Sequence, residues 1–92
     1  MNIEQVIRNH LENHLDLAHL DIKDRTGKHV HHEQFTGGHH LSAIIVSDTF
    51  ESMGLLDRHQ LVYNALGKMI KNEIHAFSME TYTPKEWGER LN

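Results

Sequence analysis

The chain has 92 residues, 38% of them hydrophobic, and a net charge of −4 with the histidines neutral. This length predicts one domain, over residues 1–92. The acidic balance disfavours a protein that acts mainly by neutralising phosphates, because such proteins usually carry a clear basic excess. No run approaches the roughly 20 apolar residues of a membrane span, and no secretory signal is visible. We therefore expect a cytoplasmic protein, or one of an organelle matrix if an import segment was removed.

Histidine dominates the polar chemistry of the chain: it occurs ten times, and cysteine is absent. Histidine changes its charge near physiological pH and is the commonest metal ligand in proteins. Without cysteine, the chain has no disulfide and no thiolate ligand of its own. The composition therefore points to metal or proton chemistry.

The N-terminal segment predicts a helix followed by a strand. Near residues 2–15, apolar residues recur with the helical period of 3.6. His10 and His14 are four residues apart on this helix, a spacing at which two histidines can share a metal. Because no third ligand is near in sequence, we interpret them as rings packed at the edge of the apolar stripe. Residues 18–24 then alternate between apolar and polar, which predicts a half-buried strand.

A long connection, residues 25–39, separates this strand from the next and holds a histidine-rich segment. A loop of this length in a compact domain is usually functional or mobile. The alternative interpretation is a solvated polar loop that happens to be rich in histidine. A second strand is predicted near 40–47, and its middle is apolar on both faces, which is typical of a central or covered strand.

The rest of the chain is organised around a helix near 57–71 and a strand near 74–82. The helix shows one apolar stripe with Asp57 as its predicted N-cap, and the strand shows a period of two. The sequence Thr-Pro-Lys-Glu that follows is a capping box with proline at the first helical position, and it starts a short helix near 84–91. The predicted order is α-β-β-α-β with a terminal helix.

Three short motifs in this part are specific in combination, although each alone is weak. They are Arg-His-x-x-Val from Arg58, Ile-His-Ala from Ile74, and Thr-Pro-x-x-Trp from Thr83. With these spacings and the preceding strands, the chain resembles the BolA family over most of its length. The resemblance implies an α+β fold similar to the class II K-homology domain, with a three-stranded mixed sheet, helices on one face and a short C-terminal helix.

The resemblance also implies a function and candidate ligands. BolA proteins are partners of monothiol glutaredoxins and share a [2Fe–2S] cluster with them, with glutathione as the partner's co-ligand, in iron–sulfur delivery or iron regulation. The family's histidine ligand in the Ile-His-Ala segment corresponds to His75. The second ligand, in the loop before the second strand, corresponds to His40, with His39 beside it. The chain departs from the family at Gln60, where a basic residue is common, and at Ser52, where glycine is common.

The chemistry of the residues agrees with a shared cluster. Imidazole can replace thiolate at one or two positions of an iron–sulfur cluster, so a chain without cysteine needs thiolates from a partner. A cluster held by neutral imidazole should be labile and sensitive to pH, which suits transfer. The less favoured ligands in the loop are His29, His31 and His32. The candidates for contacts with the partner are Arg58, His59, Lys68 and Lys71.

Two alternatives stay open. Some BolA proteins are described as transcriptional regulators, so DNA binding is the runner-up, although the net charge disfavours it and the Gly-x-x-Gly loop of K-homology domains is absent. The second alternative is a divalent-metal-binding protein that uses residues 29–40 for zinc, copper or nickel without a partner. We predict no enzyme activity, because no nucleophile stands in a recognisable motif and no carboxylates are paired by spacing.

Overall fold

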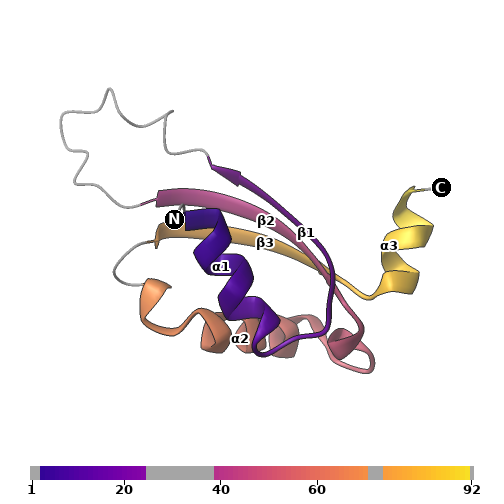
Figure 1. Ribbon diagram of the computed structural model, residues 1–92. Helices are drawn as coiled ribbons and strands as arrows, with labels where there is room; N and C mark the ends of the chain where they lie inside the picture. The colour runs from indigo at the N-terminus through magenta and orange to yellow at the C-terminus, as the bar shows by residue number, and fades with distance from the viewer. Residues whose placement is uncertain (1–2, 25–38, 71–73, 92) are drawn as a thin grey trace.

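Three α-helices and one sheet build the part of the chain that the computed structural model describes, residues 3–24, 39–70 and 74–91 (Figure 1). Within these residues no helix is long and apolar enough to cross a bilayer. The α+β class and the predicted order of elements are confirmed. The elements are α1 (Ile3–Glu12), β1 (Leu17–Asp24), β2 (His39–Ser47), the 3-10 helix η2 (Asp48–Phe50), α2 (Leu55–Leu66), the 3-10 helix η3 (Gly67–Ile70), β3 (Ile74–Tyr82) and α3 (Pro84–Leu91).

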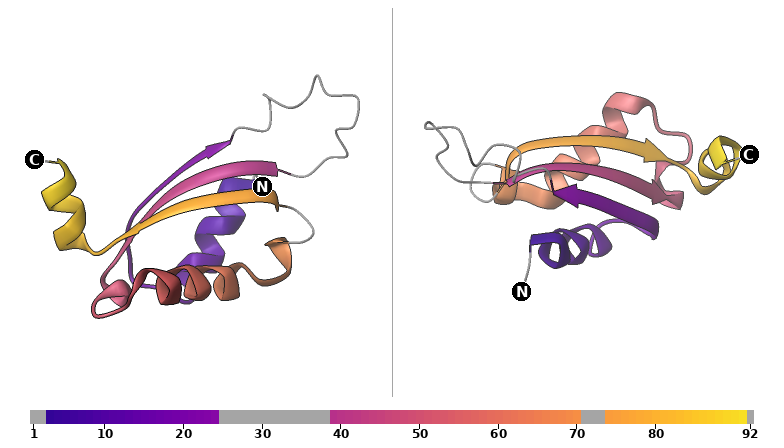
Figure 2. Two further views of the ribbon diagram at one scale, coloured as in Figure 1. Left: turned by 180° about the vertical axis from the view of Figure 1, so that it is seen from behind. Right: turned by 90° about the horizontal axis from the view of Figure 1, so that it is seen from above.

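β2 is the central strand of a mixed sheet, as its two apolar faces predict. β1 pairs with it antiparallel and β3 pairs with it parallel. α1 and α2 cover one face of the sheet, and α3 lies beyond the end at which β3 finishes (Figure 2). We call the opposite face the open face. Its residues alternate with those of the core, and they are His19, Asp21, Lys23, His40, Ser42, Ile44, Val46, Ser78, Glu80 and Tyr82.

The core fills the space between the covered face and the two helices. Ile7 and Leu11 of α1, Ile45 of β2, and Val62 and Leu66 of α2 have no exposed surface. Burying each of these side chains stabilises the fold by roughly 1.5–3 kcal/mol before entropy is counted. The helical and strand periods predicted from the sequence therefore do select the faces that meet in the core.

The start of α2 differs from the prediction. The helix begins at Leu55 with Gly54 as its N-cap, so the assignment of Asp57 as the N-cap is wrong. Asp57 instead lies in the first turn, where its charge still suits the positive end of the helix dipole. Before the helix, Ser52 has a φ of 64°, in the left-handed region that favours glycine. The glycine that the family resemblance leads us to expect at this position would therefore have a backbone reason.

The helix ends are also corrected. α1 ends at Glu12 rather than near residue 15. α2 ends at Leu66, because Gly67 takes a φ of 57° as its C-cap, and the chain continues as η3 rather than as α-helix to residue 71. Glycine is the usual residue at such an end, because it has no Cβ to clash. The predicted strands agree with the structure to within one residue.

Trp87 docks α3 on the open face. Its ring stacks on His19 and packs against Tyr82, with a centroid distance of 5.4 Å in each case. The Arg90 guanidinium lies 5.4 Å from the Trp87 ring centroid and 5.6 Å from that of Tyr82. Leu91, four residues further along the helix, is 64% exposed and contributes little to this docking.

Candidate metal-ligating site at the strand starts

The register of β2 and β3 brings the main predicted ligands to one end of the sheet. His39 pairs with Ile74 and His40 pairs with Ala76, with an irregularity between the two pairs. His75 therefore lies on β3 between the two residues that face His39 and His40. Parallel strands start at the same edge of a sheet, so residues 35 positions apart in sequence meet there because of this pairing alone.

His40 belongs to the open face. Leu41, the next residue, is buried in the core, and successive side chains of a strand point to opposite faces. His40 is half-buried. α1 and α2 leave this face of the sheet uncovered (Figure 1). For His39 and His75 the structure describes only the backbone, which lies at the start of β2 and of β3.

The remaining predicted ligands do not complete a metal centre within the described residues. His29, His31, His32 and Lys71 lie outside them, and Lys68 is placed only by its backbone in η3. Among the described residues there is no group of three or more histidine, aspartate or glutamate side chains that could hold a metal. His10, considered with His14 as a metal pair, instead directs Nδ1 to the Ala65 carbonyl at 3.3 Å, which agrees with a ring packed at the helix edge.

Arg58, predicted to contact a partner, is engaged inside the molecule. Its side chain is only 12% exposed. Nε donates to the Met53 carbonyl at 2.9 Å, and the guanidinium donates to both carboxylate oxygens of Glu86 at 2.7 and 3.2 Å and to the Thr81 carbonyl at 3.3 Å. This bidentate pairing ties the start of α2 to the start of α3. The geometry therefore gives Arg58 a structural role.

Glu86 closes the same network and confirms the capping box. The Thr83 amide donates to Glu86 Oε1 at 2.8 Å, and the Glu86 amide donates to Thr83 Oγ1 at 3.1 Å. The Arg58 guanidinium, helped by the Thr83 amide, lowers the pKa of Glu86 to about 2. The carboxylate is thus held in its charged form by its partners.

His59, the other predicted contact residue on α2, is half-buried. Its Nε2 atom is shielded from solvent and has no hydrogen-bond partner among the described residues. The ring nitrogen is therefore not presented at the surface in this conformation. α2 itself lies on the covered side of the sheet, opposite the face that carries His40 (Figure 2).

These features define a small α+β domain that brings imidazoles, but no thiolates, to the starts of two parallel strands. The sequence model of the BolA family, described as BolA-like protein, matches residues 11–86. The chain belongs to this family.

Relatives and solved structures agree with the assignment. The chain is 30% identical over 87 residues to the DNA-binding transcriptional regulator BolA of Haemophilus influenzae, covering 95% of this chain and 82% of the relative. It superposes on a bol-like protein from Babesia bovis with a TM-score of 0.80 and 32% identity, covering 100% and 96% of the two chains. The BolA domain of SufE1 from Arabidopsis thaliana gives a TM-score of 0.77 and 34% identity, covering 94% and 98%.

Proposed function

We propose that this chain is a non-enzymatic partner of a monothiol glutaredoxin and that the two proteins share a [2Fe–2S] cluster. The complex would serve iron–sulfur cluster assembly, delivery or iron regulation, in the cytoplasm. His75 and His40 are the proposed ligands of this chain, with His39 as a substitute for His40. The single observation that supports this best is the β2–β3 register, which sets His75 between the partners of His39 and His40.

The donors present on the chain fit such a group. Imidazole is an accepted replacement for thiolate on one iron of a [2Fe–2S] cluster. The chain holds ten histidines and no cysteine, so the thiolates must come from the glutaredoxin and its glutathione. When bound, the cluster supplies iron and sulfide for transfer. The chain contributes neutral imidazoles at the ends of strands whose pairing holds their backbone in place.

Strand placement suits His75 to the role of the principal ligand. β3 pairs with the central strand at Ile74 and from Ala76 to Tyr82, and His75 lies at the irregularity between these pairs, directly after the core residue Ile74, which is 2% exposed. His40 similarly precedes Leu41, which is 3% exposed. Each candidate ligand therefore stands next to a residue anchored in the core, and this limits the backbone motion that binding would have to suppress.

Co-expression with a monothiol glutaredoxin tests the proposal. We expect a purified heterodimer whose visible absorption and circular dichroism show a cluster and differ from those of the glutaredoxin alone. Calorimetric titration of the isolated chain with zinc, copper or nickel tests the metal-binding alternative. Absence of a complex, or a spectrum identical to that of the glutaredoxin alone, would contradict the proposal.

A DNA-binding regulator is the second candidate, because the Haemophilus influenzae relative is named as one. Two observations oppose it: the net charge is −4, and Arg58 donates to internal acceptors. A labelled DNA duplex titrated at low and at physiological salt separates the two functions. Binding that weakens steeply with salt would favour the regulator.

A further inference from the structure

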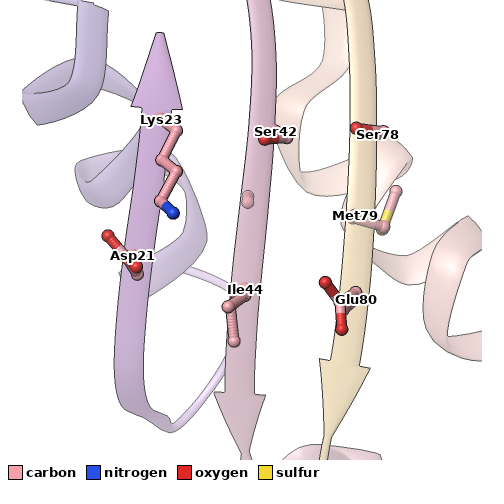
Figure 3. A pocket seen from close by; sticks show the side chains of 8 residues that line it. Asp21, Lys23, Ser42, Ile44, Ser78, Met79 and Glu80 are labelled. Carbon is pink, nitrogen blue, oxygen red and sulfur yellow. The ribbon is translucent and has the colours of Figure 1, made fainter.

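A hollow lies on the open face between the strand starts and α3. It has a volume of about 310 Å³, and its walls come from all three strands (Figure 3). Ile44 of β2 lies at its middle, with Asp21 of β1 and Glu80 of β3 in register on either side. Lys23 and Ser78 lie in the next row of paired residues, on either side of Ser42. Two carboxylates thus flank one apolar side chain, across two strand spacings of about 5 Å each.

The charges of the hollow favour a cationic occupant. Asp21 and Glu80 outnumber Lys23 among the lining residues, Arg90 of α3 lies 3.7 Å from Oε1 of Glu80, and the chain as a whole carries −4. The Lys23 side chain runs along β1 toward the row of Asp21, so its ammonium lies on the Asp21 side of the hollow, with Glu80 on the other side of Ile44 (Figure 3). The lysine side chain is flexible, so an occupant can displace it without disturbing ordered structure. An acidic occupant would meet two like charges.

The hollow also adjoins the proposed ligand site. Ser42, which borders it, is two residues after His40 on the same strand and the same face, about 7 Å away along the strand. A protein that reaches the imidazole of His40 must therefore lie over the hollow. At the far end the open face is already taken by Trp87 of α3, so the hollow is the part left for the partner.

We propose that this hollow receives a basic side chain, an arginine or lysine, of the protein that docks on the His40 end of the sheet. Ile44 supports the aliphatic stem, and Asp21 with Glu80 receives the charge. The identity of the docking protein rests on the proposed function; the preference for a basic side chain does not. The contact would fix the orientation of the partner relative to the two candidate ligands.

Charge reversal at Asp21 tests the proposal in the complex. Asp21→Lys should weaken the affinity for the glutaredoxin about tenfold in calorimetry at low salt, whereas saturating protein should still give the cluster spectrum. Glu12→Lys is the matched control, because it makes the same charge change at the exposed end of α1 on the covered side, and it should change the affinity less than twofold. Glu80 is not substituted, because it also accepts from Tyr82 and pairs with Arg90.

A measurement without the partner decides the chemistry even if the glutaredoxin does not bind. The isolated chain is titrated with the blocked tripeptides acetyl-Gly-Arg-Gly-amide and acetyl-Gly-Glu-Gly-amide, followed by amide NMR shifts. We expect saturable shifts at residues 21–23, 42–44 and 78–80 with the arginine peptide only. Asp21→Lys should abolish them, and Lys23→Ala should tighten binding about threefold because the competing ammonium is gone. Equal shifts with both peptides, or none, would overturn the proposal.

Discussion

Polar side chains have different roles at the two ends of the sheet. At the α3 end, Arg58, Thr83 and Glu86 satisfy one another and the backbone within the chain. At the opposite end, histidines from β2 and β3 are brought into neighbouring positions by strand register. The first arrangement stabilises the fold. The second gathers donors whose chemistry suits a ligand from outside. Substitutions at the α3 end should therefore change stability, and those at the histidine end should change cluster binding.

His75→Ala should give the largest effect. We expect the cluster spectrum of the heterodimer to be lost or strongly changed, because the principal imidazole is gone. The melting temperature of the isolated chain should stay close to that of the wild type, because the residue stands at the start of β3, at the irregularity in its pairing with β2. Visible circular dichroism of the complex and thermal unfolding of the chain measure the two quantities. An unchanged spectrum and transfer rate would remove His75 as a ligand.

Arg58→Ala should have the opposite effect: the stability of the chain should fall, and the cluster spectrum of the heterodimer should be kept. It removes donors to Met53, Thr81 and Glu86, and the lost charge-assisted hydrogen bonds should cost about 2–3 kcal/mol of unfolding free energy. For a chain of this size, the melting temperature should fall by roughly 10 °C or more. Arg58→Lys keeps the charge without the planar fork and should recover only part of the loss. Denaturant unfolding of the three proteins checks the order. A stable Arg58→Ala variant that fails to bind the glutaredoxin would assign Arg58 to the partner instead.

Glu86→Gln isolates the ion pair, because glutamine can still serve the capping box. The Glu86 pKa is about 2 in the folded chain against 4.5 as its ordinary value. A lowered folded pKa contributes stability that is present above the ordinary value and is lost as the pH falls toward 2. The variant should be less stable by about 1 kcal/mol at pH 7, since Glu86 is partly exposed, and the difference should shrink as the pH falls from the ordinary pKa through about 2. Unfolding curves between pH 7 and 2 measure it. A difference that does not depend on pH would contradict the pairing.

His40→Ala should have a smaller effect than His75→Ala at the same end. We expect the cluster to form and to be lost several-fold faster, because His39 can take over as a ligand after a small shift of the strand start. The combined change of His39 and His40 should be worse than either alone. The decay of cluster absorption after removal of free iron gives the rates. Equal decay in all three variants would place the second ligand elsewhere.

Ser52→Gly should have the smallest effect and should act on stability alone. A φ of 64° strains a serine and not a glycine, so the variant should gain about 0.5–1 kcal/mol after the added entropy of the unfolded chain is counted. Thermal unfolding measures the gain, and Ser52→Ala, which keeps a Cβ at this φ, is the control. A loss of stability would mean that the serine side chain stabilises this turn.

The sequence alone determined the types and order of the elements, the faces that form the core and the capping box. These follow from local rules: the side-chain periods of 3.6 and two, and hydrogen bonds between residues three apart. The resemblance in the motifs pointed to His75 and His40, but only the parallel pairing of β2 and β3 places them side by side.

Three other features depend on the tertiary structure and do not follow from local rules. Arg58 and Glu86 are 28 positions apart, and nothing in their own segments predicts that they pair. The N-cap is Gly54 and not the predicted Asp57, because the turn through Ser52 sets where the helix begins. The hollow between Asp21 and Glu80 exists only because β1 and β3 flank the same central strand. Each of these depends on which distant segments pack together, and a local pattern does not encode that choice.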